Sequence, residues 1–135
     1  DYGTSMKAPD YLAINPMGKV PALVHHVAGR DRVVTEAAAI CAYLADAFPE
    51  AGLLPEADGR AAYFRWLFFC AGPVEAAIMD RHRKVGVSDE QKVMVGYGRY
   101  DEAVGALEGA MPTGEGWIAG DRFTAADVYV GSTVS

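Results

Sequence analysis

Pro21 constrains the fold of this chain more than any other residue, because it stands at the entrance to an apolar run of strand-forming residues. Proline has no N–H group, so it is tolerated at the first residue of a strand but not at the centre of a sheet. Residues 21–27 therefore read as a strand, residues 28–31 as a turn that contains Gly29, and residues 32–35 as a second strand. This spacing predicts an antiparallel hairpin.

The peptide bond between Val20 and Pro21 can be either trans or cis. X-Pro bonds are the only ones in which a cis peptide costs little, yet cis accounts for only about 5–6% of them. Spacing alone therefore favours a trans proline that enters an edge strand. In the cis alternative, the N–H and C=O of Val20 would face outward, and an extended ligand could bond to both groups, as in strand addition.

An alanine-rich helix is predicted directly after the hairpin. Its apolar positions follow the spacing of one helical stripe: Ile40, Tyr43, Leu44, Ala47 and Phe48. Thr35 is the expected N-cap, Glu36 lies in the first turn, and Pro49 ends the helix. A carboxylate at this end ordinarily complements the helix dipole. The alternative is that Glu36 holds a ligand ammonium group while the free N–H groups beside it hold a ligand carboxylate.

The chain after residue 59 is predicted to be wholly helical. The first helix has one apolar stripe: Tyr63, Trp66, Leu67, Cys70 and Val74. Gly72-Pro73 should bend or split this helix. Ser88 and Gln91 form a capping box that opens the next helix. The apolar face of that helix contains Val93, Tyr97, Tyr100, Val104, Leu107 and Met111. Four glycines interrupt the second helix, which indicates close backbone approach or a less regular helix.

A third helix is predicted to begin at Thr124. Thr124 and Asp127 have the spacing of a capping box, in which each side chain satisfies a backbone N–H at the helix start. Phe123 and Val128 have the spacing of a hydrophobic staple. These features stabilise a helix start and carry no chemistry.

Net charge disfavours two classes of partner. The 135 residues carry a net charge of −6, with no basic run or stripe, so neither nucleic acid nor an anionic membrane is expected. No apolar stretch approaches the length of a membrane span. Cys41 and Cys70 stand alone and read as small buried apolar residues, with nothing to favour a disulfide between them. A reducing, cytoplasmic location is therefore expected.

No metal site is predicted from the histidines. His25 and His26 are neighbours on a strand and point to opposite faces, so they cannot chelate one metal ion together. His82 lies in a short basic cluster late in a helix, where cations suit the dipole.

Two motifs together resemble those of the cytosolic glutathione transferase superfamily. Residues 15–23, followed by residues 35–40 and Tyr43-Leu44, resemble its glutathione site, and residues 119–127 resemble a folding motif of its helical domain. The resemblance implies an α+β/α protein: part of a thioredoxin-like N-terminal domain, here a hairpin plus a helix, followed by an all-helical C-terminal domain.

The resemblance also divides the chain. Residues 1–50 would be the C-terminal part of the glutathione-binding domain, residues 51–58 a linker, and residues 59–135 the first helices of the all-α domain. A strand-helix-strand unit would precede residue 1, and further helices would follow residue 135. The catalytic Tyr, Ser or Cys of the family is expected on that preceding unit, so no residue of this chain is assigned a catalytic role.

Five residues inherit glutathione-binding roles from the resemblance. Val20 would pair with the cysteinyl backbone of glutathione across a cis Pro21. Glu36 and Ala37 would hold the γ-glutamyl end, and Lys19 would lie near the glycyl end. Ala37 departs from the family pattern, because many members carry Ser there and use its hydroxyl for the ligand carboxylate.

The function implied is a dimeric glutathione transferase that joins glutathione to a hydrophobic electrophile, as in detoxification, without a metal. Phe64, Trp66, Phe68 and Phe69 could line the pocket for the electrophile, although helical aromatic stripes more often belong to a core or a subunit interface. The alternatives are a non-catalytic scaffold or regulatory module, since fold does not fix function, and a superfamily isomerase, peroxidase or dehalogenase.

Overall fold

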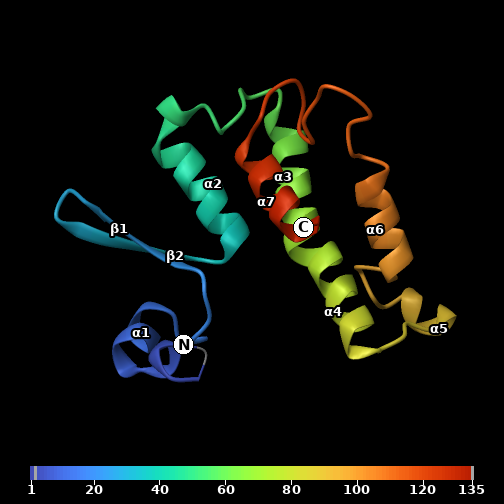
Figure 1. Ribbon diagram of the computed structural model, residues 1–135, viewed down its shortest axis with the longest axis horizontal. Coiled ribbons are helices and arrows are strands. Elements are labelled where there is room, and N and C mark those ends of the chain that lie inside the picture. The colour runs from blue at the N-terminus through green and yellow to red at the C-terminus, as the bar shows by residue number, and fades with distance from the viewer. Residues whose placement is uncertain (2, 135) are drawn as a thin grey trace.

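The computed structural model describes Asp1 and residues 3–134. The hairpin and α1 lie to one side, α3, α4, α6 and α7 lie to the other, and α2 lies between the hairpin and α7 (Figure 1). The elements in chain order are η1 (Ser5–Lys7), α1 (Pro9–Ile14), β1 (Ala22–Val27), β2 (Arg30–Thr35), α2 (Ala37–Ala47), η2 (Pro49–Ala51), α3 (Arg60–Phe69), η3 (Cys70–Val74), α4 (Glu75–Arg83), α5 (Asp89–Lys92), α6 (Tyr100–Glu108) and α7 (Ala125–Val134). None of the described helices is both long and apolar enough to cross a membrane.

The predicted hairpin is present, with a tighter turn than the sequence indicated. β1 and β2 pair antiparallel, with Ala22 opposite Thr35 and Val27 opposite Arg30. Only Ala28 and Gly29 form the turn, at φ values of 50° and 72°. Two central residues at positive φ match the twist of the flanking strands, so pairing continues up to the turn and β2 begins at Arg30 instead of residue 32.

The predicted N-cap at Thr35 is wrong. Thr35 is the last residue of β2 and pairs with Ala22, so its backbone belongs to the sheet. Glu36 stands between strand and helix at a φ of 68°, and α2 begins at Ala37. The abrupt change from strand to helix thus takes place at one residue, which leaves no room for a separate cap.

The predicted stripe of α2 does not face the helical core. Ala38 and Ala45 are the buried residues of α2, whereas Leu44 and Phe48 are 36% and 39% exposed. Phe48 and Tyr43 instead contact the ring of His25 on β1, and the Tyr43 hydroxyl lies 2.8 Å from His25 Nδ1. α2 therefore has two contact faces: alanine side chains face the other helices, and aromatic side chains face the hairpin.

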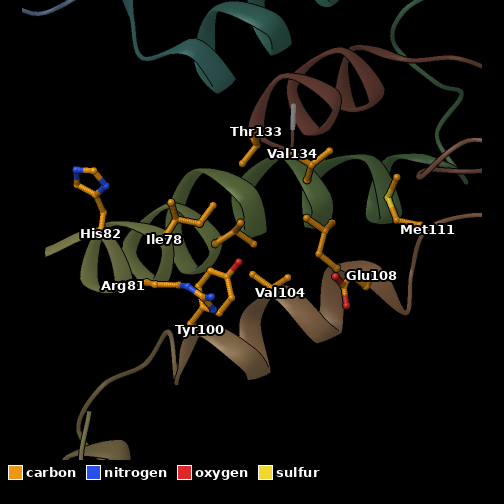
Figure 2. Close-up of a pocket in the computed structure, with 11 residues that line it drawn as sticks. Ile78, Arg81, His82, Tyr100, Val104, Glu108, Met111, Thr133 and Val134 are labelled. Atoms are coloured by element: carbon orange, nitrogen blue, oxygen red, sulfur yellow. The ribbon is translucent and has the colours of Figure 1, made fainter. Parts of the chain in front are cut away.

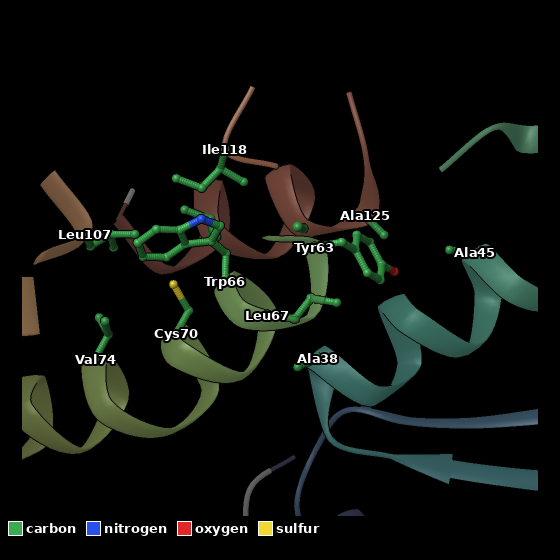
Figure 3. Close-up of a cluster of buried hydrophobic side chains, with 12 residues drawn as sticks. Ala38, Ala45, Tyr63, Trp66, Leu67, Cys70, Val74, Leu107, Ile118 and Ala125 are labelled. Carbon is green, nitrogen blue, oxygen red and sulfur yellow. The ribbon is translucent and has the colours of Figure 1, made fainter. Parts of the chain in front are cut away.

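The stripe predicted for the first helix of the second half is confirmed. Tyr63, Trp66, Leu67, Cys70 and Val74 are all buried, and they pack with residues of α2 and α7 (Figure 3). Removing each such side chain from water stabilises the fold by roughly 1.5–3 kcal/mol.

Gly72-Pro73 neither splits this helix nor ends it. η3 is one turn of π-helix with Pro73 inside it, and α3, η3 and α4 follow one another without a break. A π-turn widens the backbone, which accommodates a proline ring that would clash in a regular α-helix.

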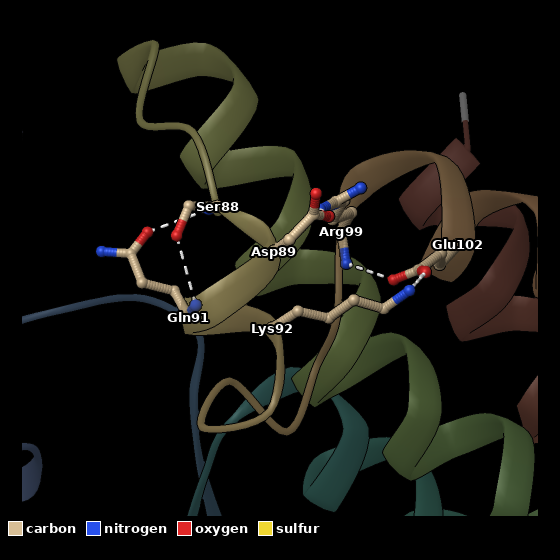
Figure 4. Close-up of polar contacts among 6 residues, drawn as sticks. All are labelled: Ser88, Asp89, Gln91, Lys92, Arg99 and Glu102. Atoms are coloured by element: carbon tan, nitrogen blue, oxygen red, sulfur yellow. Dashed lines mark hydrogen bonds and ion pairs between the residues drawn. The ribbon is translucent and has the colours of Figure 1, made fainter.

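The single long helix predicted after Ser88 is wrong, although its start is confirmed. Ser88 accepts the Gln91 N–H at 3.2 Å and its own N–H is accepted by the Gln91 side chain at 2.9 Å (Figure 4). The resulting α5 has only 4 residues. Gly98 then takes a φ of 70°, and α6 begins at Tyr100.

Ion pairs hold the two short helices together. Lys92 of α5 pairs with Glu102 of α6, and Asp89 pairs with Arg99 (Figure 4). Val93, which was expected on the apolar face, lies in the connecting segment with Met94, and the two are 91% and 88% exposed. The irregular alternative indicated by the glycines is therefore the correct one.

The start of α7 is only partly as predicted. The Asp127 carboxylate accepts the Thr124 N–H at 2.8 Å, which is half of a capping box. The Thr124 hydroxyl does not accept in return, because it donates to the same carboxylate at 2.9 Å. Phe123 packs edge-on against Trp117, and Phe123 and Val128 are 41% and 45% exposed, so the hydrophobic staple between them stays a prediction.

Candidate functional site

A cavity of about 630 Å³ lies where the entrance to β1, the start of α2, the α3–α4 helix and the end of α7 meet; we call it the α2 cavity. Its lining consists of Val20, Pro21, Glu36, Ala37, Ala38, Ala39, Phe68, Ala71, Glu75, Ile78, Tyr129, Ser132 and Thr133. Four of the five residues singled out from the sequence therefore meet on one surface. The fifth, Lys19, is not part of this lining.

The loop before β1 is fixed by its own hydrogen bonds. Asn15, only 4% exposed, donates from Nδ2 to the Lys19 carbonyl at 2.8 Å and accepts the Met17 N–H at 3.1 Å. Lys7 Nζ donates to the carbonyls of Met17 and Gly18, at 3.0 Å each. A buried side chain that both donates and accepts a hydrogen bond at the base of the loop gives Val20 and Pro21 a defined position on the surface.

The Val20–Pro21 peptide bond is cis. The trans form favoured by spacing alone is therefore wrong, and the cis form implied by the family resemblance is correct. Val20 is 65% exposed and precedes β1, so its N–H and C=O lie outside the β1–β2 ladder. The geometry leaves this backbone open to the cavity that Val20 lines.

The start of α2 presents N–H groups and a carboxylate to the same cavity. The first helical hydrogen bond runs from the Ile40 N–H to the Glu36 carbonyl at 2.9 Å. The N–H groups of residues 37–39 precede it, so they have no partner within the helix. Ala37, Ala38 and Ala39 all line the cavity, and Glu36 is exposed beside them. Such an end attracts an anionic group, while Glu36 attracts a cationic one.

The opposite side of the cavity is formed by helices, and we call Phe68, Ala71, Glu75, Ile78 and Tyr129 the helical wall. Burial, and after it the nearby carboxylate of Glu75, raises the pKa of the Tyr129 phenol, which stays protonated at neutral pH. Sequence reasoning missed Glu75 and Tyr129. The spacing of residues 68, 71, 75 and 78 on one helical face was the available signal.

The aromatic residues proposed for an electrophile pocket have different positions. Phe68 lines the α2 cavity and is 66% exposed. Phe64 stacks against it with ring centroids 6.1 Å apart. Trp66 and Phe69 belong to the core, as the more ordinary interpretation held.

Neither cysteine has the character of a nucleophile. Both are free thiols, and burial raises the pKa of Cys41 and raises the pKa of Cys70 to about 11. A thiol must be deprotonated to attack, so these two remain inert at neutral pH. Among the described residues, no group of three or more His, Cys, Asp and Glu side chains could hold a metal ion.

A second cavity, of about 730 Å³, lies between α4, α6 and the end of α7, and we call it the α6 cavity (Figure 2). Arg81 lies over the ring of Tyr100, 4.1 Å from its centroid, at one end of this cavity. His82, Val104 and Met111 also line it. None of the residues singled out from the sequence as binding residues lines this second cavity.

Comparison with known proteins identifies two domain models along the chain. Residues 2–47 match the model of the glutathione S-transferase N-terminal domain. Residues 60–134 match the model of the glutathione S-transferase C-terminal domain.

Individual proteins are similar along most of the chain. A glutathione S-transferase from Xanthomonas campestris, GST-4.5, is 33% identical over 93% of this chain and 63% of its own length. A maleylacetoacetate isomerase from Pseudomonas aeruginosa is 31% identical over 95% of this chain and 61% of its own length. The chain thus spans about three fifths of the curated relatives it matches.

A solved structure has the same arrangement of elements. The glutathione transferase YghU from Streptococcus pneumoniae, complexed with glutathione, superposes with a TM-score of 0.69 at 27% identity over 94% of this chain and 49% of its own length. The predicted fold class, a thioredoxin-like part followed by a helical part, is confirmed.

Proposed function

We propose, from the premise that this chain belongs to the glutathione S-transferase superfamily, that the α2 cavity binds glutathione and that the whole protein joins glutathione to an electrophilic small molecule. One observation carries the proposal. Val20, Pro21, Glu36 and Ala37 come from two segments separated by the hairpin, and all four line one cavity. Residues 1–50 would supply the glutathione site, residues 51–58 a linker, and residues 59–135 the helical domain.

The surface suits the charges of a γ-glutamyl tripeptide. The exposed backbone of Val20 can form strand-like hydrogen bonds with the cysteinyl residue. The N–H groups at the start of α2 can hold the γ-glutamyl carboxylate, and the Glu36 carboxylate can hold the ammonium group. Lys19, which is not part of the cavity lining, would act only at the glycyl end, toward the rim.

The reaction requires a thiolate. Its sulfur attacks an electrophilic carbon, a carbon–sulfur bond forms, and a leaving group departs with its electron pair. Within the described part of the chain, the residues at the cavity bind and orient the tripeptide and supply part of the electrophile site. Neither Cys41 nor Cys70 lines this cavity, and burial raises the pKa of each, so neither is assigned thiol activation.

Titration calorimetry of the whole native protein with glutathione tests this proposal. We expect saturable binding at micromolar to millimolar glutathione, weakened about two- to fivefold by Glu36→Gln, because an exposed ion pair contributes up to about 1 kcal/mol. Glu50→Gln, at an exposed carboxylate on η2, is the matched control and should bind as the wild type does. Absence of binding at millimolar glutathione would sink the proposal.

A second candidate function is isomerisation. It is favoured by the similarity to the maleylacetoacetate isomerase, which extends over 95% of this chain. The two activities separate in a direct assay: an isomerase would consume no glutathione during turnover, whereas a transferase would consume one molecule for each product formed.

We also propose that the whole protein is a cytoplasmic homodimer. Gel filtration with light scattering would test whether it is a dimer.

A further inference from the structure

The helical wall of the α2 cavity combines an apolar surface with a charge. Phe68, Ala71, Glu75 and Ile78 all line the cavity from the continuous helix that runs from α3 through η3 to α4. Phe68 is 66% exposed and supplies an open aromatic face. Glu75, also exposed, lies between this aromatic residue and Ile78. A ligand on this wall therefore contacts apolar groups beside a carboxylate.

The charged residue types in the lining of this cavity are all acidic. Glu36 and Glu75 are the acidic side chains of the lining, and the described lining contains no Lys, Arg or His. Both carboxylates line the cavity together with the Tyr129 phenol, whose pKa is raised by burial and next by Glu75. Glu36 and Glu75 therefore belong to one electrostatic environment, although they come from opposite sides of the cavity.

The two carboxylates have different partners when the tripeptide is bound. Glu36 lies beside the N–H groups of residues 37–39, where a γ-glutamyl ammonium and carboxylate would both be satisfied. Glu75 lies on α4 beside the apolar lining residues Phe68, Ala71 and Ile78, where a substituent on sulfur would have room. Glutathione itself brings two carboxylates and one ammonium, so its binding leaves the charge of Glu75 uncompensated.

We propose that Glu75 sets the charge selectivity of the electrophile site, so that the enzyme favours cationic or neutral aromatic electrophiles and rejects carboxylate-bearing ones. This inference rests on the proposed function, since it concerns the second substrate of the same cavity. A substrate that is anionic, as maleylacetoacetate is by its name, would be disfavoured at this wall.

The expected size of the effect follows from Coulomb's law. A single charge on a ligand about 6 Å from an exposed carboxylate, at an effective dielectric constant between about 40 and 80, changes affinity roughly three- to tenfold. A cationic and an anionic ligand of the same shape differ by two charges, so their ratio should reach roughly ten- to a hundredfold. Arg81 and His82 line the α6 cavity beyond Ile78 and Thr133, so probes should carry a single aromatic ring.

The test measures binding instead of turnover, so that it does not depend on thiol activation. Three S-substituted glutathiones of matched shape serve as probes: S-benzylglutathione, S-(4-carboxybenzyl)glutathione and S-(4-aminomethylbenzyl)glutathione. Their dissociation constants are measured by titration calorimetry on the whole native protein, on Glu75→Gln, and on Glu90→Gln as an exposed control on α5. Glutathione alone is titrated into each variant, and circular dichroism checks that each variant folds.

The wild type should bind the aminomethyl probe most tightly and the carboxyl probe most weakly. Glu75→Gln should reduce the ratio between these two at least threefold, while Glu90→Gln leaves it unchanged. A ratio that is the same in Glu75→Gln and wild type would overturn the inference while leaving glutathione binding, and so the proposed function, intact. Failure of the wild type to bind glutathione at all would overturn both.

Discussion

Replacing Asp127 by alanine is expected to lower the free energy of unfolding by about 3–4 kcal/mol, although this residue carries no chemistry. Its carboxylate accepts three hydrogen bonds: from the Ile118 N–H at 2.8 Å, the Thr124 N–H at 2.8 Å and the Thr124 hydroxyl at 2.9 Å. Thr124 and Ile118 are buried, at 1% and 8% exposure, so water cannot replace the lost acceptor freely. A hydrogen bond to a charged group contributes roughly 1.5–3 kcal/mol, and partial relaxation reduces the sum.

Two further substitutions apportion this effect. Thr124→Val keeps the shape of the side chain and removes only the hydroxyl donor, so we expect a loss of about 1 kcal/mol. Asp121→Ala removes an exposed carboxylate from the same loop and should change stability by less than about 0.5 kcal/mol.

Urea unfolding of the whole native protein, followed by circular dichroism at 222 nm, measures all three variants under one condition. A loss below 1 kcal/mol for Asp127→Ala would refute the reasoning, because it would mean that the buried N–H groups of Ile118 and Thr124 find other partners. A loss for Asp121→Ala as large as that for Asp127→Ala would show that loop charge, and not the three hydrogen bonds, stabilises the start of α7.

Two other predictions concern binding and the core. Ala37→Ser should tighten glutathione binding about three- to tenfold in titration calorimetry, because a hydroxyl at the start of α2 adds one hydrogen bond to the ligand carboxylate; unchanged affinity would count against Ala37 as a ligand-binding residue. Leu67→Ala should lower the free energy of unfolding by about 2–4 kcal/mol in the same urea assay, because Leu67 is 1% exposed and its removal leaves a cavity; a loss below 1 kcal/mol would contradict the core described above.

The sequence predicts those parts of the fold in which local pattern and burial agree. The hairpin at Pro21 and the stripe from Tyr63 to Val74 are present, because strand entry and helical periodicity were each reinforced by tertiary packing. The stripe predicted for α2 fails because that helix has two partners. Periodicity identifies the larger side chains, such as Tyr43, which contact the hairpin, while the helical core receives alanines.

In the second half of the chain, periodicity alone does not predict where a helix breaks. A helical pattern continued through residues 89–111, yet Gly98 at a φ of 70° and the ion pairs of Lys92 and Asp89 divide it into α5 and α6. Glycine allows either outcome, so sequence periodicity alone cannot choose between a continuous helix and a break. The structure distinguishes them because Val93 and Met94 have no core to enter and lie exposed.

The candidate site was predicted on one side only. Val20, Pro21, Glu36 and Ala37 belong to two motifs whose order and spacing mark them, and the structure brings them to one cavity. Glu75 and Tyr129 reach that cavity from helices about forty to ninety residues later in the chain, and no local motif marks them. Their position depends on the packing of α7 against α2, which is a property of the tertiary fold.

Amide chemical shifts of the isotope-labelled whole protein, recorded during addition of glutathione, test the central claim most directly. We predict that the N–H signals of Val20 and of residues 37–39 shift in a saturable manner with one common dissociation constant. Signals of Arg81 and Tyr100 at the α6 cavity should move less. Shifts confined to the α6 cavity, or no saturable shifts up to millimolar glutathione, would contradict the assignment of the α2 cavity as the glutathione site.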